Sequence, residues 1–299
     1  MGSFAAFGGD GGPHSARISD GHAWHRLRGW EFVLGICITA VALAIPLLDV
    51  HERPLPRVAI SLDGTHVFYV HDPSVDHANI QETISTPLVI FISYSIPIVV
   101  HAVMQWRHPL PHATRDFVLS LLVATALEHL VTNVIKIHAG RFRPNFYAMC
   151  AWDTSVTDWD GTMNLCRSAR GEKEGRQSFP SGHASCAFST FGLLSVCHTF
   201  FVLCTPHCTT RPLHMHQLHR TLHLYVACLP LLLAAWIAVT RFQDMWHFPS
   251  DILAGAGIGL LTAWVAYRHH FHHLTKDEVV YNQVAIDDDT NSTEISTLA

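Results

Sequence analysis

Residues Phe117–Ile135 read FVLSLLVATALEHLVTNVI, an almost wholly apolar stretch that ends at Lys136. A helix needs about 20 such residues to cross the ~30 Å hydrocarbon core of a bilayer. Runs of similar composition occur at Phe32–Leu48, Pro87–Trp106, Ala184–Leu203, Leu224–Val239 and Ile252–Tyr267. Their flanks carry Arg, His, Asp or Trp, which is typical of membrane interfaces. The pattern predicts an all-α bundle of six transmembrane helices.

The composition of the 299-residue chain agrees with a membrane protein. Charged residues make up 14% of the chain, whereas an average soluble domain has about 25%. Hydrophobic residues account for 49%, and the net charge is −5 with histidine neutral. Because the chain has no basic excess, nothing indicates a nucleic-acid partner. The expected partner is the lipid bilayer.

Three parts of the chain are expected: a tail over 1–29, a membrane domain over 30–270 and a second tail over 271–299. The first tail is polar and Gly-rich. It lacks the short apolar segment and cleavage site of a signal peptide, so we expect the first helix to remain in the mature protein. The second tail is acidic and rich in Ser and Thr, which is typical of disorder.

An even number of spans would place both tails on the same side of the membrane. The connections that follow the first, third and fifth spans would then share the opposite side. The distribution of Lys and Arg mildly favours cytosolic tails. We therefore expect a multi-pass protein of the plasma membrane or an endomembrane, whose active site faces the lumen or the cell exterior.

Three polar clusters occur at the span ends that this topology brings together. The first is KIHAGRFRP, which starts at Lys136 and contains Arg143, and the second is the sequence PSGH over Pro180–His183. The third, TRFQDMWHFPSD, starts at Thr240 and contains Arg241, His247 and Asp251. Three fixed cations, two histidines and a carboxylate are therefore expected to converge at one membrane surface.

These residue types suit the chemistry of a phosphate ester. Guanidinium and ammonium groups stabilise the charge on phosphoryl oxygens, and a Ser-Gly-His turn at a helix start can present backbone N–H groups to an anion. Because His247 and Asp251 are four residues apart at a helix start, the carboxylate can hold one ring nitrogen while the other acts as a nucleophile. His183 could then protonate the leaving oxygen.

The three clusters resemble the signature of the type 2 phosphatidic acid phosphatase (PAP2) superfamily, which reads K-x6-R-P, P-S-G-H and S-R-x5-H-x3-D. Their order and spacing agree with it, and the one departure is Thr240 in place of serine. The resemblance covers about Phe117–Tyr267. The wider sequence GRFRPNFYAMC is most similar to lipid phosphate phosphatases and diacylglycerol pyrophosphate phosphatases.

The resemblance implies a helical bundle of the PAP2 and vanadium haloperoxidase type, with no cofactor. It implies metal-independent hydrolysis of phosphatidate, lysophosphatidate, diacylglycerol pyrophosphate or sphingoid phosphates through a phosphohistidine. It assigns His247 as the nucleophile, Asp251 as its orienting partner and His183 as the acid. The phosphate ligands that it implies are Lys136, Arg143, Ser181, Gly182 and Arg241.

Other functions stay open at this point. A lipid phosphotransferase of the sphingolipid-synthase kind would use similar chemistry, although such enzymes generally lack the K-x6-R-P cluster. A non-catalytic lipid-binding or transport relative would usually lack one of the site residues, and none is missing here. Residues Asp158–Thr162 read D-x-D-x-T, the motif of magnesium-dependent aspartyl phosphatases, but their polar flanks predict a solvated loop.

Several polar residues lie outside the three clusters. His129, Asn133 and Lys136 share one helical face, and our hypothesis is that this face lines the access route to the phosphate site. Hydrogen bonding of Glu128 and His129 within the bundle is the alternative. Cys150 and Cys166 share one connection, where an oxidising lumen would permit a disulfide.

Two groups of histidines are predicted to lie in the headgroup region on the tail side, with metal binding as the alternative. The first group precedes the fifth apolar run and the second follows the sixth. Their members are His214, His216, His219, His223, His269, His270, His272 and His273.

Overall fold

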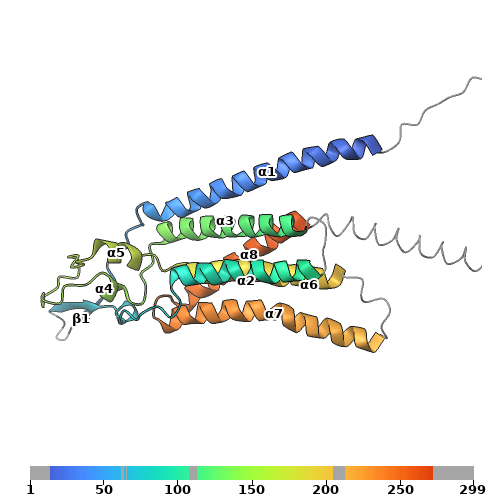
Figure 1. Ribbon diagram of the computed structural model, residues 1–299. Coiled ribbons are helices and arrows are strands. Elements are labelled where there is room, and N and C mark those ends of the chain that lie inside the picture. Colours follow the sequence, from blue (N-terminus) through green and yellow to red (C-terminus); the bar gives the residue numbers. More distant parts are fainter. Residues whose placement is uncertain (1–13, 62–63, 65, 108–112, 205–212, 272–299) are drawn as a thin grey trace, which may run out of the picture.

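The computed structural model describes the chain apart from residues 1–13, 62–63, 65, 108–112, 205–212 and 272–299, and apart from the side chains of 14–28, 200–204 and 213–220. Six long helices form a bundle (Figure 1). Five of these helices contain stretches that are long and apolar enough to cross a membrane. The remaining long helix is α6. These elements are α1 (His14–Ala44), α2 (Thr86–Arg107), α3 (Ala113–Ala139), α6 (Gly182–Cys204), α7 (Leu213–Gln243) and α8 (Pro249–Phe271).

Each of the six predicted apolar runs falls largely within one of these helices, and the prediction of a helical membrane bundle is confirmed. Most helices continue past their apolar run, because polar residues beyond the hydrocarbon layer still make backbone i→i−4 hydrogen bonds. Helix α1 begins at His14, within the expected tail, and ends at Ala44. The 3-10 helix η1 (Ile45–Leu47) follows and contains Pro46. Because proline has no N–H to donate to the next helical hydrogen bond, the α-helix ends before it.

Helix α6 lies at the centre of the bundle, where it contacts α2, α3, α7 and α8. Its approach to α8 depends on two glycines. A Cβ atom at Gly255 would lie 2.5 Å from the carbonyl oxygen of Ser181, and one at Gly259 would lie 2.4 Å from that of Ser185. Only glycine permits such close backbone contact, so these two residues fix the distance between the helices that begin at the PSGH and HFPSD sequences.

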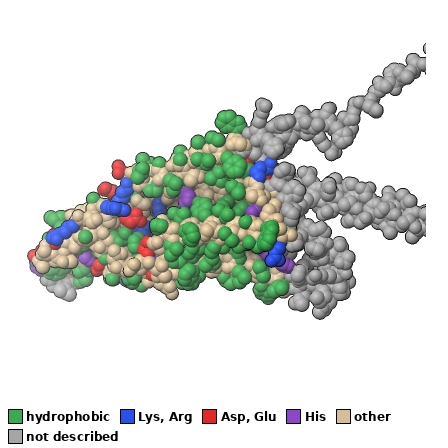
Figure 2. Space-filling view, in the orientation of Figure 1, with side chains coloured by type: hydrophobic (Ala, Val, Ile, Leu, Met, Phe, Trp, Pro, Cys, Tyr) green, Lys and Arg blue, Asp and Glu red, His purple; other side chains and the backbone are tan. Residues whose placement is uncertain are grey.

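Hydrophobic side chains cover much of the bundle face seen in Figure 2. Phe91, Leu232 and Leu253 are each at least 65% exposed. Contiguous exposed apolar surface of this kind is rare on soluble monomers but is expected where lipid tails surround a helix.

A small cap covers one end of the bundle (Figure 1). It contains the antiparallel hairpin β1 (Arg57–Ser61) and β2 (Val67–His71), the 3-10 helix η2 (Pro73–Val75), and the short helices α4 (Phe146–Met149) and α5 (Ala169–Gly175). The Cys150–Cys166 disulfide joins the two sides of the long connection between α3 and α6. The apolar core of the cap includes Phe142, Phe146 and Tyr147, and it reaches Phe248, next to His247.

Candidate active site

The predicted site residues come together at the end of the bundle that carries the cap. The charge of Lys136, at the end of α3, interacts with those of Arg143 and Asp251. His183 on α6 lies near Arg241 and His247. A Cβ atom at Gly182 would lie 3.5 Å from Nζ of Lys136, so the start of α6 faces the lysine ammonium group.

The Asp251 carboxylate at the start of α8 is fully buried and held by several donors. Its Oδ2 atom accepts hydrogen bonds from Oγ of Ser178 at 2.6 Å and from the backbone N–H of Phe248 at 3.0 Å. Its Oδ1 atom accepts one from Nη1 of Arg141 at 2.6 Å. Nδ1 of His247 lies 3.8 Å from Oδ2, which is longer than a hydrogen bond. The carboxylate is therefore fixed beside the imidazole rather than bonded to it.

His247 lies between α7 and α8 and is only 2% exposed. Burial lowers its pKa to about 3; the Asp251 carboxylate opposes this shift, whereas the charges of Arg143 and Lys136 add to it. A buried imidazole beside cations loses its proton more readily, because the charged form is poorly solvated and repelled. The ring is consequently neutral at physiological pH, with a lone pair on one nitrogen.

The Arg143 guanidinium is held against the cap. Its Nη2 atom donates to the Glu174 carboxylate, and its Cζ lies 4.8 Å from the ring centroid of Trp246. Burial alone would raise the pKa of Glu174, but the charges of Arg143 and Lys136 lower it by more than burial raises it. The carboxylate is therefore ionised. Nε of Arg143 has no hydrogen-bond partner in the described part of the chain. One face of the cation is thus neutralised, and one N–H remains available.

Arg241, near the end of α7, is completely buried. Its Nη2 atom donates to Asp244 at 2.7 Å and its Nη1 atom donates to Glu82 at 3.2 Å. Asp244 in turn accepts two hydrogen bonds from Thr83, one from the backbone and one from the side chain, each at 2.7 Å. These contacts connect the end of α7 to the segment before α2 and fix the orientation of the guanidinium.

Some polar groups of the PSGH turn hold the fold together, and others remain free for a ligand. The N–H of Ser181 donates to the carbonyl of Asp251 at 3.0 Å, so it is not one of the free N–H groups that the sequence suggested. The Ser181 hydroxyl is buried and has no hydrogen-bond partner among the described residues. Nε2 of His183 lies 3.1 Å from the carbonyl oxygen of Ile84. Since a carbonyl can only accept, Nε2 carries a hydrogen.

Five residues of the site were missed from the sequence: Glu82, Arg141, Glu174, Ser178 and Asp244. Two of them had a usable signal, because Asp244 lies three residues after Arg241 on a helix and Arg141 lies within the same short cluster as Arg143. Glu82 and Ser178 lie in connecting segments and Glu174 lies in the short helix α5, all at no regular spacing from their partners, so only the folded chain reveals them.

Polar residues in the middle of α3 bear on the predicted access route along His129, Asn133 and Lys136. Nδ2 of Asn133 donates to the carbonyl of Ala42 at 2.9 Å, so this side chain binds α1. Glu128 accepts a hydrogen bond from the Ser185 hydroxyl on α6, and its Oε2 atom lies 3.1 Å from Nδ1 of His129. These contacts favour the alternative, in which the polar residues join helices within the bundle.

Other predictions from the sequence have clear outcomes. The D-x-D-x-T sequence lies in an exposed loop of the cap, where Asp160 accepts hydrogen bonds from the N–H groups of Thr162 and Met163, each at 2.8 Å. Its prediction as a loop is confirmed. Of the clustered histidines, only the side chains of His223, His269 and His270 belong to the described residues.

Comparisons with known proteins agree with the sequence signature. A family model described as the PAP2 superfamily matches residues 117–274. The chain is 32% identical to lipid phosphate phosphatase 2 of Arabidopsis thaliana over 190 residues, which are 62% of this chain and 61% of that protein. It is 30% identical to diacylglycerol pyrophosphate phosphatase 1 of Saccharomyces cerevisiae over 217 residues, covering 68% and 70% of the two chains.

The matched regions cover only part of some relatives. The chain spans 61% of the length of Arabidopsis lipid phosphate phosphatase 2 and 51% of that of lipid phosphate phosphatase 1. A solved structure, the transmembrane PAP2 type phosphatidylglycerolphosphate phosphatase from Bacillus subtilis, matches with 18% identity and a TM-score of 0.35. This match covers 60% of this chain and 71% of that one.

Proposed function

The chain belongs to the PAP2 superfamily, and on this premise we propose that it is a membrane-embedded phosphatase of lipid phosphates. The observation that carries the proposal is the convergence of three signature clusters at one end of an apolar helical bundle. A phosphorylated headgroup at the membrane surface would meet cations there while its tails stay in lipid. The Arabidopsis and yeast relatives named above carry the names of enzymes with this substrate class.

In the proposed reaction His247 is the nucleophile. The lone pair of its neutral imidazole forms a P–N bond as the P–O bond to the leaving group breaks, and His183 supplies the proton that the leaving oxygen takes up. Water then attacks the phosphohistidine and gives a proton back to His183, which releases inorganic phosphate and restores both imidazoles. The lowered pKa of His247 supports this role, because only an unprotonated nitrogen can attack. Asp251 would stabilise the positive charge that the ring gains.

The cations of the site would stabilise the phosphoryl oxygens. Lys136, Arg143 and Arg241 are the proposed ligands, supported by the free Nε–H of Arg143 and the fixed orientation of Arg241. The Ser181 hydroxyl and the backbone of Gly182 at the start of α6 would complete the set, since the first N–H groups of a helix have no partner within it. No metal ion is assigned a role in this proposal.

The first test is phosphate release by the purified full-length protein in detergent, with phosphatidate, lysophosphatidate, diacylglycerol pyrophosphate and sphingoid phosphates as substrates. We expect turnover in excess chelator and its complete loss in His247→Ala. Loss of one transition-state donor typically costs ~10²–10³ in rate, so Arg143→Ala and Arg241→Ala should fall in that range. Strict dependence on magnesium, or activity that persists in His247→Ala, would contradict the mechanism.

Two further readings of the same assay separate the remaining alternatives. Rapid acid-free quenching of a reaction with ³²P-labelled substrate should trap label on the wild-type protein and none on His247→Ala. Transfer of a lipid headgroup to ceramide, without free phosphate, would identify a phosphotransferase instead. A fully folded protein with no activity on any lipid phosphate would identify a non-catalytic relative.

A further inference from the structure

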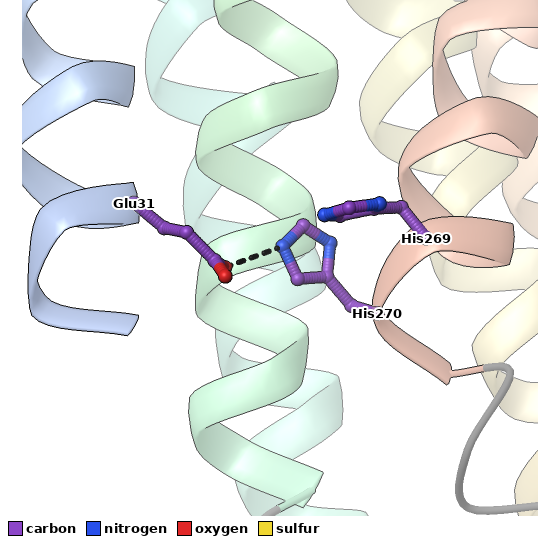
Figure 3. A group of neighbouring side chains, drawn as sticks. All are labelled: Glu31, His269 and His270. Carbon is purple, nitrogen blue, oxygen red and sulfur yellow. Dashed lines mark ion pairs between the residues drawn. The ribbon is translucent and has the colours of Figure 1, made fainter. Parts of the chain in front are cut away.

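A second cluster of ionisable side chains lies at the opposite end of the bundle from the cap. It joins Glu31 on α1 to His269 and His270 on α8, and the ligand atoms of all three lie within 4.8 Å of one another. Figure 3 shows the Glu31 carboxylate reaching toward the two imidazoles. Because the C-terminal end of α8 and helices α4 and α5 lie at opposite ends of the fold (Figure 1), this cluster is separate from the proposed phosphatase site.

One ring nitrogen of His270 is bound to its own helix. Its Nδ1 atom lies 3.0 Å from the carbonyl oxygen of Ala266 and must donate to it, because a carbonyl can only accept. In a neutral ring the other nitrogen, Nε2, then carries a lone pair. Metal-binding histidines usually have this arrangement, with one nitrogen donating to a carbonyl and the other bound to the ion.

That lone pair faces a carboxylate. Nε2 of His270 lies 3.3 Å from Oε2 of Glu31, and both atoms are buried with no hydrogen-bond partner in the described part of the chain. His270 itself is 2% exposed. If Nε2 carries a lone pair, two acceptor atoms at this distance repel each other, so either a proton on Nε2 or a metal ion must lie between them. Two ligands that each lie ~2.0–2.1 Å from a tetrahedral zinc ion are ~3.3 Å apart.

The surroundings of the cluster strengthen this requirement. A cavity of about 190 Å³ adjoins the three side chains, and its other walls are apolar groups of α1 and α3 such as Leu34, Ile38 and Leu127. Beside such apolar walls, a carboxylate oxygen such as Oε2 of Glu31, which is buried without a hydrogen-bond partner among the described residues, is costly. A cation bound by Glu31 and the histidines would compensate for that cost.

We propose that Glu31, His269 and His270 form a binding site for Zn²⁺ or a similar divalent transition metal. Two imidazoles and one carboxylate are ligands typical of zinc, whereas Mg²⁺ and Ca²⁺ prefer oxygen ligands alone. The bound ion would connect α1 to α8. Since α1 packs mainly on α3 at the edge of the bundle, the ion would fasten this helix to the domain that carries the phosphatase clusters.

The test uses the full-length protein without a polyhistidine tag, purified in detergent and treated with chelator. Native mass spectrometry and titration calorimetry with ZnCl₂ should show one tightly bound ion per chain, and MgCl₂ should show none. Mutating a group that merely supports a metal ligand costs 10–100-fold in affinity. Removal of a ligand in Glu31→Gln or His270→Asn should therefore weaken zinc binding by about 100-fold or more.

The matched control is His272→Asn/His273→Asn, which changes two neighbouring histidines outside the described residues. Its zinc affinity should stay within threefold of wild type. Co²⁺ bound at the site should give the visible absorption bands of a tetrahedral complex, and His270→Asn should lose them. Equal loss of affinity in the control, wild-type affinity in Glu31→Gln, or no bound zinc at all would overturn the proposal. A lack of phosphatase activity would not count against the proposed zinc site, because these experiments measure metal binding directly.

Discussion

Arg141 and Arg143 lie two residues apart in the same cluster, but they bind different partners and therefore have different roles. Arg141 donates to Asp251 and to Ser250, so it helps to hold the carboxylate beside His247. Arg143 donates to Glu174 and keeps a free Nε–H. The Nε–H of Arg143 is therefore a buried donor that a phosphoryl oxygen could occupy. The family signature K-x6-R-P also selects Arg143.

Ser178 is expected to act as a positioning residue through Asp251. Its hydroxyl donates to the carboxylate oxygen that lies nearest to His247. A hydrogen bond to a charged group contributes about 1.5–3 kcal/mol, so Ser178→Ala should lower kcat by at least about tenfold and leave KM nearly unchanged. The control is Ser250→Ala, since Ser250 is exposed and its hydroxyl contacts Arg141 rather than Asp251. Equal effects of the two substitutions on kcat would refute this role.

The buried neutral His247 should make the folded protein sensitive to acid. Its pKa is about 3 in the folded state and about 6.5 in an unfolded chain. Between these values the unfolded state binds a proton that the folded state does not, so stability falls as the pH decreases through this range. From pH 6.5 to pH 5 one such group costs on the order of 2 kcal/mol.

Thermal unfolding in detergent at pH 7 and pH 5 measures this effect. The melting temperature of the wild type should drop more between the two pH values than that of His247→Gln, which has no titrating ring. Other histidines contribute equally to both proteins, so the difference between the two drops isolates His247. Parallel curves would show that the imidazole is protonated in the folded state.

At the scale of single elements, apolar composition was sufficient to predict the helices but not their ends. Apolar residues mark the part of a helix that meets lipid, whereas the ends depend on backbone hydrogen bonds and on residues such as Pro46. The hairpin β1–β2 was missed, although an Asp-Gly pair separates its two apolar runs. The signature spacing predicted the main site residues, but the carboxylates that hold them come from distant segments with no periodic relation to them.

The contact between α6 and α8 gives a prediction that compares three glycines of one helix. A Cβ atom at Gly255 or Gly259 would meet backbone atoms of α6, whereas nothing lies within 4 Å of one at Gly257. Gly255→Ala and Gly259→Ala should therefore separate the two helices, lower the melting temperature and reduce activity. Gly257→Ala should be neutral or slightly stabilising, because alanine is favoured over glycine inside a helix by ~0.5–1 kcal/mol. Similar melting temperatures for all three variants would contradict the proposed packing.

At the scale of the whole molecule, the two ends of the bundle differ in chemistry. The cap end carries the Cys150–Cys166 disulfide and the proposed phosphate-binding clusters, and charged side chains gather there (Figure 2). Disulfides persist in oxidising compartments and are rare in the cytosol. The disulfide and the mild Lys and Arg bias thus favour the same orientation, with the cap outside the cytosol and the Glu31 cluster at its cytosolic border.

This orientation can be tested on sealed microsomes or intact cells, depending on where the protein resides. After blocking of free thiols, a membrane-impermeant reductant followed by an impermeant maleimide should label Cys150 and Cys166 only from the luminal or extracellular side. A Cys150→Ser/Cys166→Ser variant should lose that labelling, and it should also unfold at lower temperature, because removing a native disulfide typically costs 2–5 kcal/mol in small domains. Reduction and labelling of the wild type from the cytosolic side would indicate the opposite orientation. The proposed phosphatase site would then face the lipids of the cytosolic leaflet.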